Sequence, residues 1–193
     1  MISSTSVKVK AQEFLKPVAE SLNSLGVTPN AVTVFGFLLS LSSGLFLGAG
    51  DVLGGALLFT LSGVCDTLDG ILARVSGKKS KLGAFLDSFL DRYSDFFPIA
   101  GISYLAHTNQ DSFLLLSSLL ALAGSFSTSY ARARAEALGV ECKVGLLERP
   151  ERFFILLFGL FSGLIDLVMG VLALLTNFTA LQRLACAVKE LKG

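Results

Sequence analysis

Six apolar stretches follow one another along the chain, and short polar segments separate them. They cover approximately residues 30 to 50, 52 to 73, 82 to 106, 112 to 137, 152 to 165 and 167 to 188. A membrane-spanning helix needs roughly 20 apolar residues. The pattern therefore predicts an all-α integral membrane protein with six transmembrane helices, in which the fifth span is short and its boundary with the sixth, near 162 to 166, is blurred.

The segment before the first span alternates apolar and charged positions at helical spacing. Its apolar positions are Val7, Ala11, Phe14, Leu15, Val18 and Leu22. This pattern predicts that residues 1–28 form an interfacial amphipathic helix on the cytoplasmic leaflet; a frayed basic tail is the alternative, because short helices are marginal without a partner surface. Thr28 followed by Pro29 is typical of a helix start, so residues 29–193 are expected to form the six-helix domain.

Composition and charge add an orientation to this picture. Of the residues, 52% are hydrophobic and only 16% are charged, and the mean hydropathy is +0.69, which excludes an ordinary soluble domain. The basic residues precede the first span, surround the second and fourth connections and follow the sixth span, whereas the other connections carry mainly Asp51, His107, Asp111 and Asp166. The positive-inside rule then predicts a multi-pass protein of the plasma membrane with both termini in the cytoplasm.

Small residues and cysteines carry weaker signals. Glycines and serines crowd the first two spans, which indicates either close helix packing or a dimer face. Cys65, Cys142 and Cys186 are odd in number and scattered along the chain. Their spacing predicts neither a disulfide framework nor a zinc site, and we interpret them as packing residues.

Four aspartates lie inside the second and third predicted spans. Asp66 and Asp69 share one helix face, as do Asp87 and Asp91, because residues three or four apart on a helix are neighbours. Carboxylates are costly in a membrane unless they face the protein interior and find partners. If the two spans pack antiparallel, both pairs converge near the cytoplasmic face. Four carboxylates suit two Mg²⁺ or Mn²⁺ ions.

A groove for a nucleotide diphosphate is expected beside these aspartates. Gly70 and Ala73 remove side-chain bulk next to Asp69, and Arg74 borders the space that they leave. Metal ions and an arginine together would bind a diphosphate. The alternative is that the aspartates are structural and are satisfied by Arg74, Arg92 and nearby hydroxyl groups.

The run Asp66-x-x-Asp69-Gly70-x-x-Ala73-Arg74, eight residues, Gly83-x-x-x-Asp87-x-x-x-Asp91 resembles the signature of the CDP-alcohol phosphotransferases. The resemblance implies a membrane enzyme with six helices, usually a homodimer. It further implies transfer of a phosphatidyl-type group from a CDP-linked lipid, CDP-diacylglycerol or CDP-archaeol, to an alcohol with release of CMP. No nucleic-acid partner is expected.

The resemblance also implies roles for individual residues. One metal would be held by Asp66, Asp69 and Asp87, and a second by Asp66, Asp87 and Asp91, with Asp91 also acting as the general base. A carboxylate within hydrogen-bond reach of a hydroxyl group can remove its proton as the new bond forms. The CDP portion would be contacted by Pro29, Asn30, Gly70, Ala73, Arg74 and Ser80.

The alcohol substrate must be inferred from residues outside the shared motif. Four arginines in two polar segments could bind an acceptor phosphate, since guanidinium groups bind phosphate bidentately: Arg132, Arg134, Arg149 and Arg152. Cytoplasmic anchoring is the alternative role for them. The two segments resemble the inositol 1-phosphate branch of the family, the phosphatidylinositol phosphate and archaetidylinositol phosphate synthases.

Two other functions remain open from the sequence. Within the same chemistry, the acceptor could be glycerol 3-phosphate or another alcohol. From a different class, a divalent-cation transporter could use the same aspartates for permeation. Transporters usually place such sites near the membrane midplane on broken helices, whereas these aspartates lie toward the basic face.

Overall fold

The computed structural model describes residues 2–142 and 144–192, with side chains from residue 13 onward. The described residues form seven α-helices and no strand, which confirms the all-α prediction. A helix lies over each of the six apolar stretches, and one more precedes them. The helices are α1 (Ile2–Ser24), α2 (Pro29–Gly48), α3 (Val52–Val75), α4 (Lys81–Thr108), α5 (Ser112–Ala137), α6 (Arg149–Ser162) and α7 (Ile165–Lys192).

Side-chain caps begin the four helices α2 to α5. Thr28 accepts a hydrogen bond from the backbone N–H of Ala31, and Asp51, Ser80 and Asp111 cap α3, α4 and α5 in the same way. Each cap satisfies a backbone donor that has no partner within its helix. The boundary between α6 and α7 is a break at Gly163, whose φ of 75° lies in the left-handed region that glycine adopts readily.

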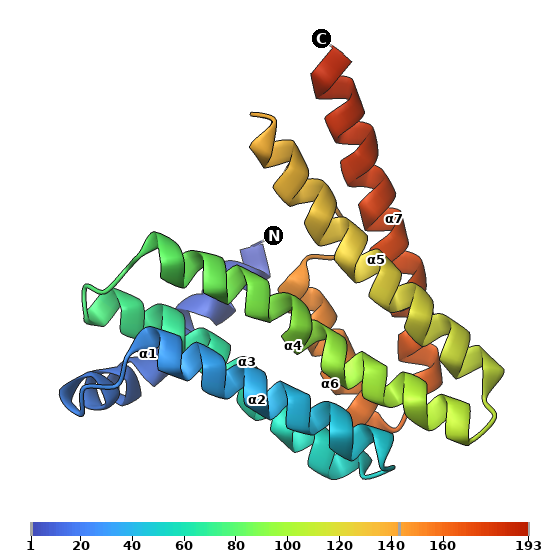
Figure 1. Cartoon of the computed structure of the whole chain (residues 1–193), viewed down its shortest axis with the longest axis horizontal. Helices are drawn as coiled ribbons and strands as arrows, with labels where there is room; N and C mark the ends of the chain where they lie inside the picture. The colour runs from blue at the N-terminus through green and yellow to red at the C-terminus, as the bar shows by residue number, and fades with distance from the viewer. Residues whose placement is uncertain (1, 143, 193) are drawn as a thin grey trace.

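The helices form two groups that meet at α4 and α5 (Figure 1). In the first group, α2 packs against both α3 and α4, and α1 lies against α3. In the second group, α5 packs along α7, and the short α6 lies between α7 and α3. The helices α3 and α4, whose antiparallel packing was the condition for the aspartates to converge, make only sparse backbone contact. Their shared neighbour α2 sets their relative position instead.

Glycines permit the close crossing of α2 and α4. A Cβ atom at Gly101 would run into the carbonyl oxygen of Gly44, and one at Gly44 would meet the backbone of Phe97. Small residues let membrane helices approach closely. The glycines of the first span therefore serve packing within the chain at this crossing.

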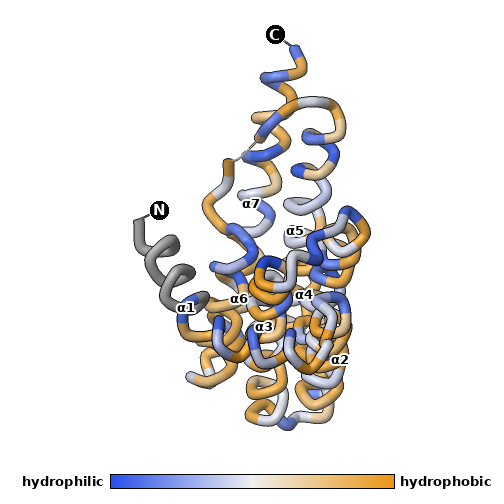
Figure 2. The backbone as a smooth tube through the Cα atoms, turned by 90° about the vertical axis from the view of Figure 1, so that its left-hand side faces the viewer, coloured by the Kyte–Doolittle hydropathy of each residue, from blue (hydrophilic) through white to orange (hydrophobic). Residues whose placement is uncertain are grey.

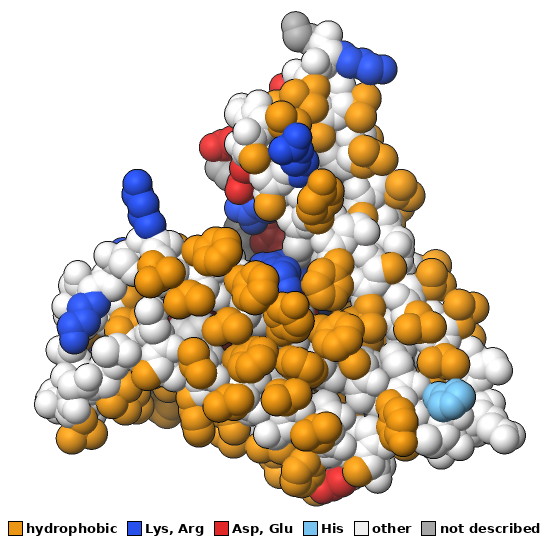
Figure 3. Space-filling view, viewed as in Figure 1, with side chains coloured by type: hydrophobic (Ala, Val, Ile, Leu, Met, Phe, Trp, Pro, Cys, Tyr) orange, Lys and Arg blue, Asp and Glu red, His pale blue; other side chains and the backbone are white. Residues whose placement is uncertain are grey.

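Four of the helices are long and apolar enough to cross a membrane, namely α2, α3, α5 and α7. The third predicted span, α4, carries several charged residues near its N-terminus, and α6 has only 14 residues. Apolar segments dominate the group that contains α2, α3 and α4 (Figure 2). Figure 3 shows a broad apolar surface on one face of the molecule, with charged side chains gathered beside it.

One prediction about the cysteines is wrong. Cys142, in the connection after α5, forms a disulfide with Cys186 on α7, across a Cα–Cα distance of 6.0 Å. The two residues lie 44 positions apart in the sequence, and only the packing of this connection on α7 brings them together. Cys65 is buried and free, as expected for a packing residue.

Candidate active site

Three of the four aspartates of the motif come together between α3 and α4. Asp66 projects from α3, whereas Asp87 and Asp91 project from successive turns of α4. One carboxylate oxygen from each of the three lies within 4.8 Å of the others. All three side chains are partly buried, so the cluster lies at the edge of the helix packing rather than deep inside it.

The fourth aspartate, Asp69, lies one turn beyond Asp66 and is only 6% exposed. Its carboxylate accepts a hydrogen bond of 2.6 Å from the hydroxyl group of Thr33 on α2. A buried carboxylate needs such a donor, because leaving its oxygen atoms unpaired away from water is costly. Thr33 was not among the predicted site residues, although it lies one helical turn after Pro29 and hence on the side of α2 where a motif residue is expected.

Arg149, the first residue of α6, joins the aspartates of both helices. Its Nη1 lies 2.9 Å from Asp66 Oδ1, and its Nη2 lies 2.9 Å from Asp91 Oδ1. Its Nε lies 3.2 Å from Asp95 Oδ1, and Arg152 Nη2 lies 3.0 Å from the second oxygen of the same carboxylate. Arg149 thus compensates the charges of Asp66 and Asp91 in this structure. From the sequence, Arg74 and Arg92 were the arginines considered for that role.

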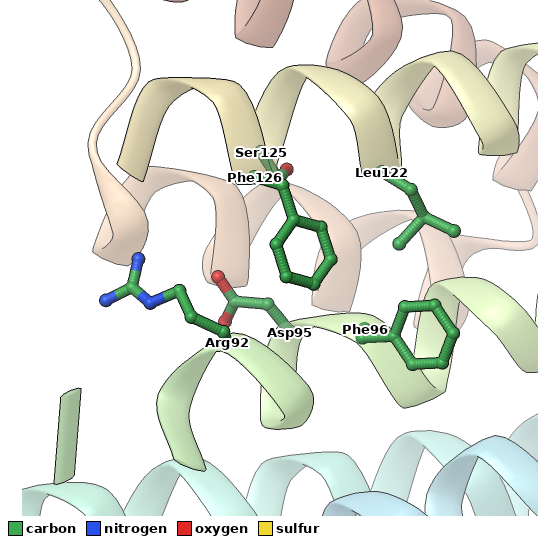
Figure 4. A pocket seen from close by; sticks show the side chains of 6 residues that line it. All are labelled: Arg92, Asp95, Phe96, Leu122, Ser125 and Phe126. Atoms are coloured by element: carbon green, nitrogen blue, oxygen red, sulfur yellow. The ribbon is translucent and has the colours of Figure 1, made fainter. Parts of the chain in front are cut away.

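Arg92 has mainly other partners. Its Nε donates to the backbone oxygen of Ser88, and its Nη1 donates to the hydroxyl group of Ser129 on α5. Its Nη2 is 3.9 Å from Asp91, at the limit of an ion pair. Arg92 therefore links α4 to α5 beside the cluster, and Figure 4 shows its side chain on α4 next to that of Asp95.

The carboxylate cluster fits a divalent cation by its chemistry. Asp66, Asp87 and Asp91 offer hard oxygen donors from two helices, the donor type that Mg²⁺ and Mn²⁺ prefer. Asp69 lies close by on α3, with one oxygen already used by Thr33. A carboxylate has a second oxygen and further lone pairs, so Asp69 can add a ligand to the same site.

The residues expected to contact a nucleotide lie near the ends of α2, α3 and α4. Asn30 and Ser80 come together around Gly83, since a Cβ atom there would lie 3.1 Å from both Asn30 Oδ1 and Ser80 Oγ. Ser80 also caps α4, and Pro29 is buried in the first turn of α2. On α3, the side of Gly70 is open, because the nearest atom to a Cβ built there is Arg74 Nη1 at 3.8 Å.

The four acceptor arginines divide into two pairs. Arg149 and Arg152 reach the aspartates, and Arg152 is only 7% exposed. Arg132 instead pairs with Glu136 at 2.8 Å on the exposed surface of α5, and Arg134 is exposed as well. The structure therefore brings two of the four arginines to the carboxylates.

This combination of a helical membrane fold with an aspartate cluster agrees with a match to a known family. The profile of the family described as CDP-alcohol phosphatidyltransferase matches residues 26–184. The chain belongs to this family, so it is a membrane transferase of phospholipid biosynthesis. The transporter interpretation is thereby set aside.

Similar proteins within the family include two named as inositol phosphate lipid synthases. The archaetidylinositol phosphate synthase of Methanothermobacter thermautotrophicus is 38% identical over 187 residues, covering 94% of this chain and 92% of that protein. The crystal structure of the phosphatidylinositol phosphate synthase of Mycobacterium tuberculosis with CDP-DAG bound superimposes with a TM-score of 0.84 at 32% identity, covering 91% of this chain and 94% of that one. A second structure of that enzyme contains manganese and citrate, with a TM-score of 0.84 at 32% identity over 90% of this chain and 88% of that one.

Asp95 is the clearest site residue that the sequence analysis did not assign. It follows Asp91 by one turn, so Asp87, Asp91 and Asp95 form a row on one face of α4. That spacing was a usable signal. Its arginine partners on α6 could not be identified in the same way, because they lie more than 50 positions further along the chain.

Proposed function

We propose that this protein transfers a phosphatidyl-type group from a CDP-linked lipid to inositol 1-phosphate and releases CMP. The observation that carries the proposal is the pairing of Arg149 with Asp66 and Asp91 of the aspartate cluster, with Arg152 beside it on Asp95, which puts phosphate-binding groups beside the reacting centre. A phosphorylated acceptor suits this arrangement better than a neutral alcohol. The names of the relatives, which span the archaetidyl and phosphatidyl enzymes, support the same acceptor.

In the proposed reaction, Asp91 acts as the general base. Its carboxylate takes the proton of the inositol hydroxyl group while the hydroxyl oxygen forms a bond to the phosphorus that carries the lipid. The bond from that phosphorus to the CMP oxygen breaks, and CMP leaves with the electron pair. Asp91 is suited to this role because it lies next to Arg149, within 2.9 Å, and hence next to the proposed site of the acceptor phosphate.

The metal ligands of this proposal are Asp66, Asp69, Asp87 and Asp91, and two Mg²⁺ or Mn²⁺ ions are the proposed cofactors. Bound divalent ions would neutralise the charge of the diphosphate and of the departing CMP. The support is the set of oxygen donors in the cluster, together with the manganese in the structure of a relative.

The substrates are assigned to opposite sides of the cluster. Pro29, Asn30, Gly70, Ala73, Arg74 and Ser80 are proposed to bind the CDP portion, a role supported by the open side of Gly70 and the grouping of Asn30 with Ser80. Arg149 and Arg152 are proposed to bind the acceptor phosphate directly. Arg132 and Arg134 are proposed to attract the acceptor at the protein surface. The ion pair between Arg132 and Glu136 would break when Arg132 binds the acceptor phosphate.

The finer membrane arrangement is also proposed. Residues 29–193 would form six membrane spans, made of the four apolar helices together with α4 and α6. Residues 1–28 would lie along the cytoplasmic leaflet. Support for the latter comes from α1, where Phe14 is 81% exposed while Ala19 is buried in a cluster with side chains of α3. Both termini and the active site would face the cytoplasm, in a homodimer in the plasma membrane.

A panel of acceptors tests the function. Purified protein in detergent would be given CDP-diacylglycerol or CDP-archaeol, Mn²⁺ or Mg²⁺, and one of inositol 1-phosphate, inositol, glycerol 3-phosphate or serine. We expect release of CMP with inositol 1-phosphate, at least about tenfold faster than with free inositol, since a lost charged hydrogen bond costs about 1.5–3 kcal/mol. A preference for glycerol 3-phosphate would overturn the assigned acceptor and leave the family reaction intact.

A further inference from the structure

Asp95 has a distinct position among the acidic residues of α4. It lies one turn beyond Asp91, outside the four-aspartate motif, and its side chain is 17% exposed. Each of its carboxylate oxygens faces a different arginine, Arg149 at 3.2 Å and Arg152 at 3.0 Å. A single carboxylate thus holds both of the arginines that we assign to the acceptor phosphate, the partly buried Arg149 and the buried Arg152.

These ion pairs connect two helices that hardly pack on each other. Within the described chain, α4 and α6 have at most sparse backbone contact, because α6 lies against α7 and α3. Ion pairs therefore fix the first turn of α6 relative to the row of aspartates on α4. Asp91 holds Arg149 through Nη2, and Asp95 holds both Arg149 and Arg152.

The surroundings of Asp95 strengthen this link. Figure 4 shows its carboxylate in a small hollow between α4 and α5, beside Phe126 and Arg92, and Phe96 lines the same hollow. A second hollow that Asp95 also lines is formed mainly by apolar side chains, together with Arg152 and Ser125. Charged hydrogen bonds are stronger where apolar groups exclude water.

We propose that Asp95 is a positioning residue for the transfer, holding Arg149 through Nε so that its two Nη groups stay between the aspartate cluster and the acceptor phosphate. This inference rests on the proposed function. When a divalent cation occupies Asp66 and Asp91, these carboxylates no longer need the Nη groups of Arg149. Asp95 then keeps the guanidinium in place, with both Nη groups directed at the phosphate.

Asp95 also affects how strongly Arg149 competes with the metal. In this structure the guanidinium shares its charge among three carboxylates, those of Asp66, Asp91 and Asp95. If Asp95 becomes neutral, Arg149 no longer has this carboxylate to retain when it leaves Asp66 and Asp91, so its release from them costs more. A cation must then displace a more firmly held arginine, so its affinity falls.

The experiment uses the full chain in detergent and compares Asp95→Asn with Asp95→Glu. Asp166→Asn, which removes an exposed aspartate at the start of α7, is the matched control. Steady-state kinetics give the KM for inositol 1-phosphate and for the CDP-lipid, and calorimetry gives the Kd for Mn²⁺ of the metal-free protein. For Asp95→Asn we expect the acceptor KM and the Mn²⁺ Kd each to rise about tenfold, with the CDP-lipid KM within about twofold of the parent.

Asp95→Glu keeps the charge and should recover part of both losses. An unchanged acceptor KM in Asp95→Asn would overturn the inference while leaving the proposed function standing. A lower melting temperature with an unchanged Mn²⁺ Kd would identify an ion pair that only stabilises the fold, which also overturns it. Should Asp95→Asn fail to accumulate, Asp95→Glu decides: its longer side chain displaces the guanidinium, so an acceptor KM equal to the parent's contradicts the inference.

The proposed function can fail separately. If the parent protein transfers nothing to inositol 1-phosphate, that function is wrong. The Mn²⁺ titration then decides the role of Asp95 alone: weaker binding in Asp95→Asn supports its hold on Arg149, and equal binding refutes it.

Discussion

The two sides of the active site are built differently. On the side of α3 and α4, the aspartates are spaced along two helices, so the helical repeat alone lines them up. On the side of α6, the arginines begin a short helix whose place depends on contacts with other parts of the chain. The positions of the aspartates are therefore determined by local spacing, whereas those of the arginines are determined by contacts with residues far away in the sequence. The two sides meet at Arg149.

The connection before α6 illustrates this dependence on α7. Arg183 on α7 donates from Nε to the backbone oxygen of Val144 and from Nη1 to that of Thr128. The backbone N–H of Leu147 donates to the hydroxyl group of Thr179. The disulfide joins the same connection to α7. The arginine end of α6 is therefore attached to α7 by several independent contacts.

Removing the metal should have the largest effect, because it disables the aspartate side entirely. We expect EDTA to reduce CMP release to the background rate, and added Mn²⁺ or Mg²⁺ to restore it, since a diphosphate cannot approach uncompensated carboxylates. The measurement is CMP formation from the CDP-lipid before and after dialysis. Full activity in EDTA would contradict the metal-binding role of the cluster.

Asp91→Asn should lower kcat by about 10²–10⁴-fold, the usual contribution of a general base. The amide has nearly the same shape as the carboxylate but cannot take the proton. Asp166→Asn, exposed and remote from the cluster, serves as the control and should keep the parental rate. A kcat within threefold of the parent would rule out Asp91 as the base.

Arg149→Lys and Arg132→Lys separate the arginines that pair with the aspartates from the exposed ones on α5. Lysine keeps the charge but loses bidentate geometry, so Arg149→Lys should raise the acceptor KM by about tenfold. Arg132→Lys should raise it by at most about threefold, because Arg132 is exposed and paired with Glu136. The KM values for inositol 1-phosphate measure both effects. A larger effect at Arg132 would reverse the assignment of the two pairs.

Breaking the disulfide should have the smallest effect on catalysis and a measurable one on stability. A cross-link of this kind typically contributes about 2–4 kcal/mol. Cys142→Ser should therefore lower the melting temperature in detergent, as should a reducing agent with the parent protein. Cys65→Ala, which leaves the disulfide intact, is the control for removing a cysteine. Identical melting curves for the parent with and without reductant would contradict a stabilising cross-link.

Much of the fold could be predicted from the sequence because its signals are local. Apolar stretches, together with Thr28 before Pro29, located the helices within a few residues. The short α6 and the break near Gly163 explain why the boundary of the fifth and sixth stretches was blurred. How closely α3 and α4 would pack was left as a condition, because helix order along the chain does not determine that α2 packs against both of them.

The part of the site that depends on local spacing could also be predicted from the sequence. The part that depends on contacts between distant residues could not. The spacing of Asp66, Asp87 and Asp91 follows from the helical repeat, and these residues do come together. The pairing of Arg149 with Asp66 joins residues 83 positions apart, and the disulfide joins residues 44 apart. Such contacts depend on the whole helix arrangement, so a single sequence leaves them open.

The most direct test of the account is to locate manganese by anomalous X-ray scattering in crystals of this protein grown with Mn²⁺. We expect two neighbouring peaks among the carboxylates of Asp66, Asp69, Asp87 and Asp91. The Nη groups of Arg149 should be withdrawn from Asp66 and Asp91, and its Nε should still be at Asp95. A peak elsewhere in the chain, or no peak with Arg149 still bound to both aspartates at saturating Mn²⁺, would contradict it.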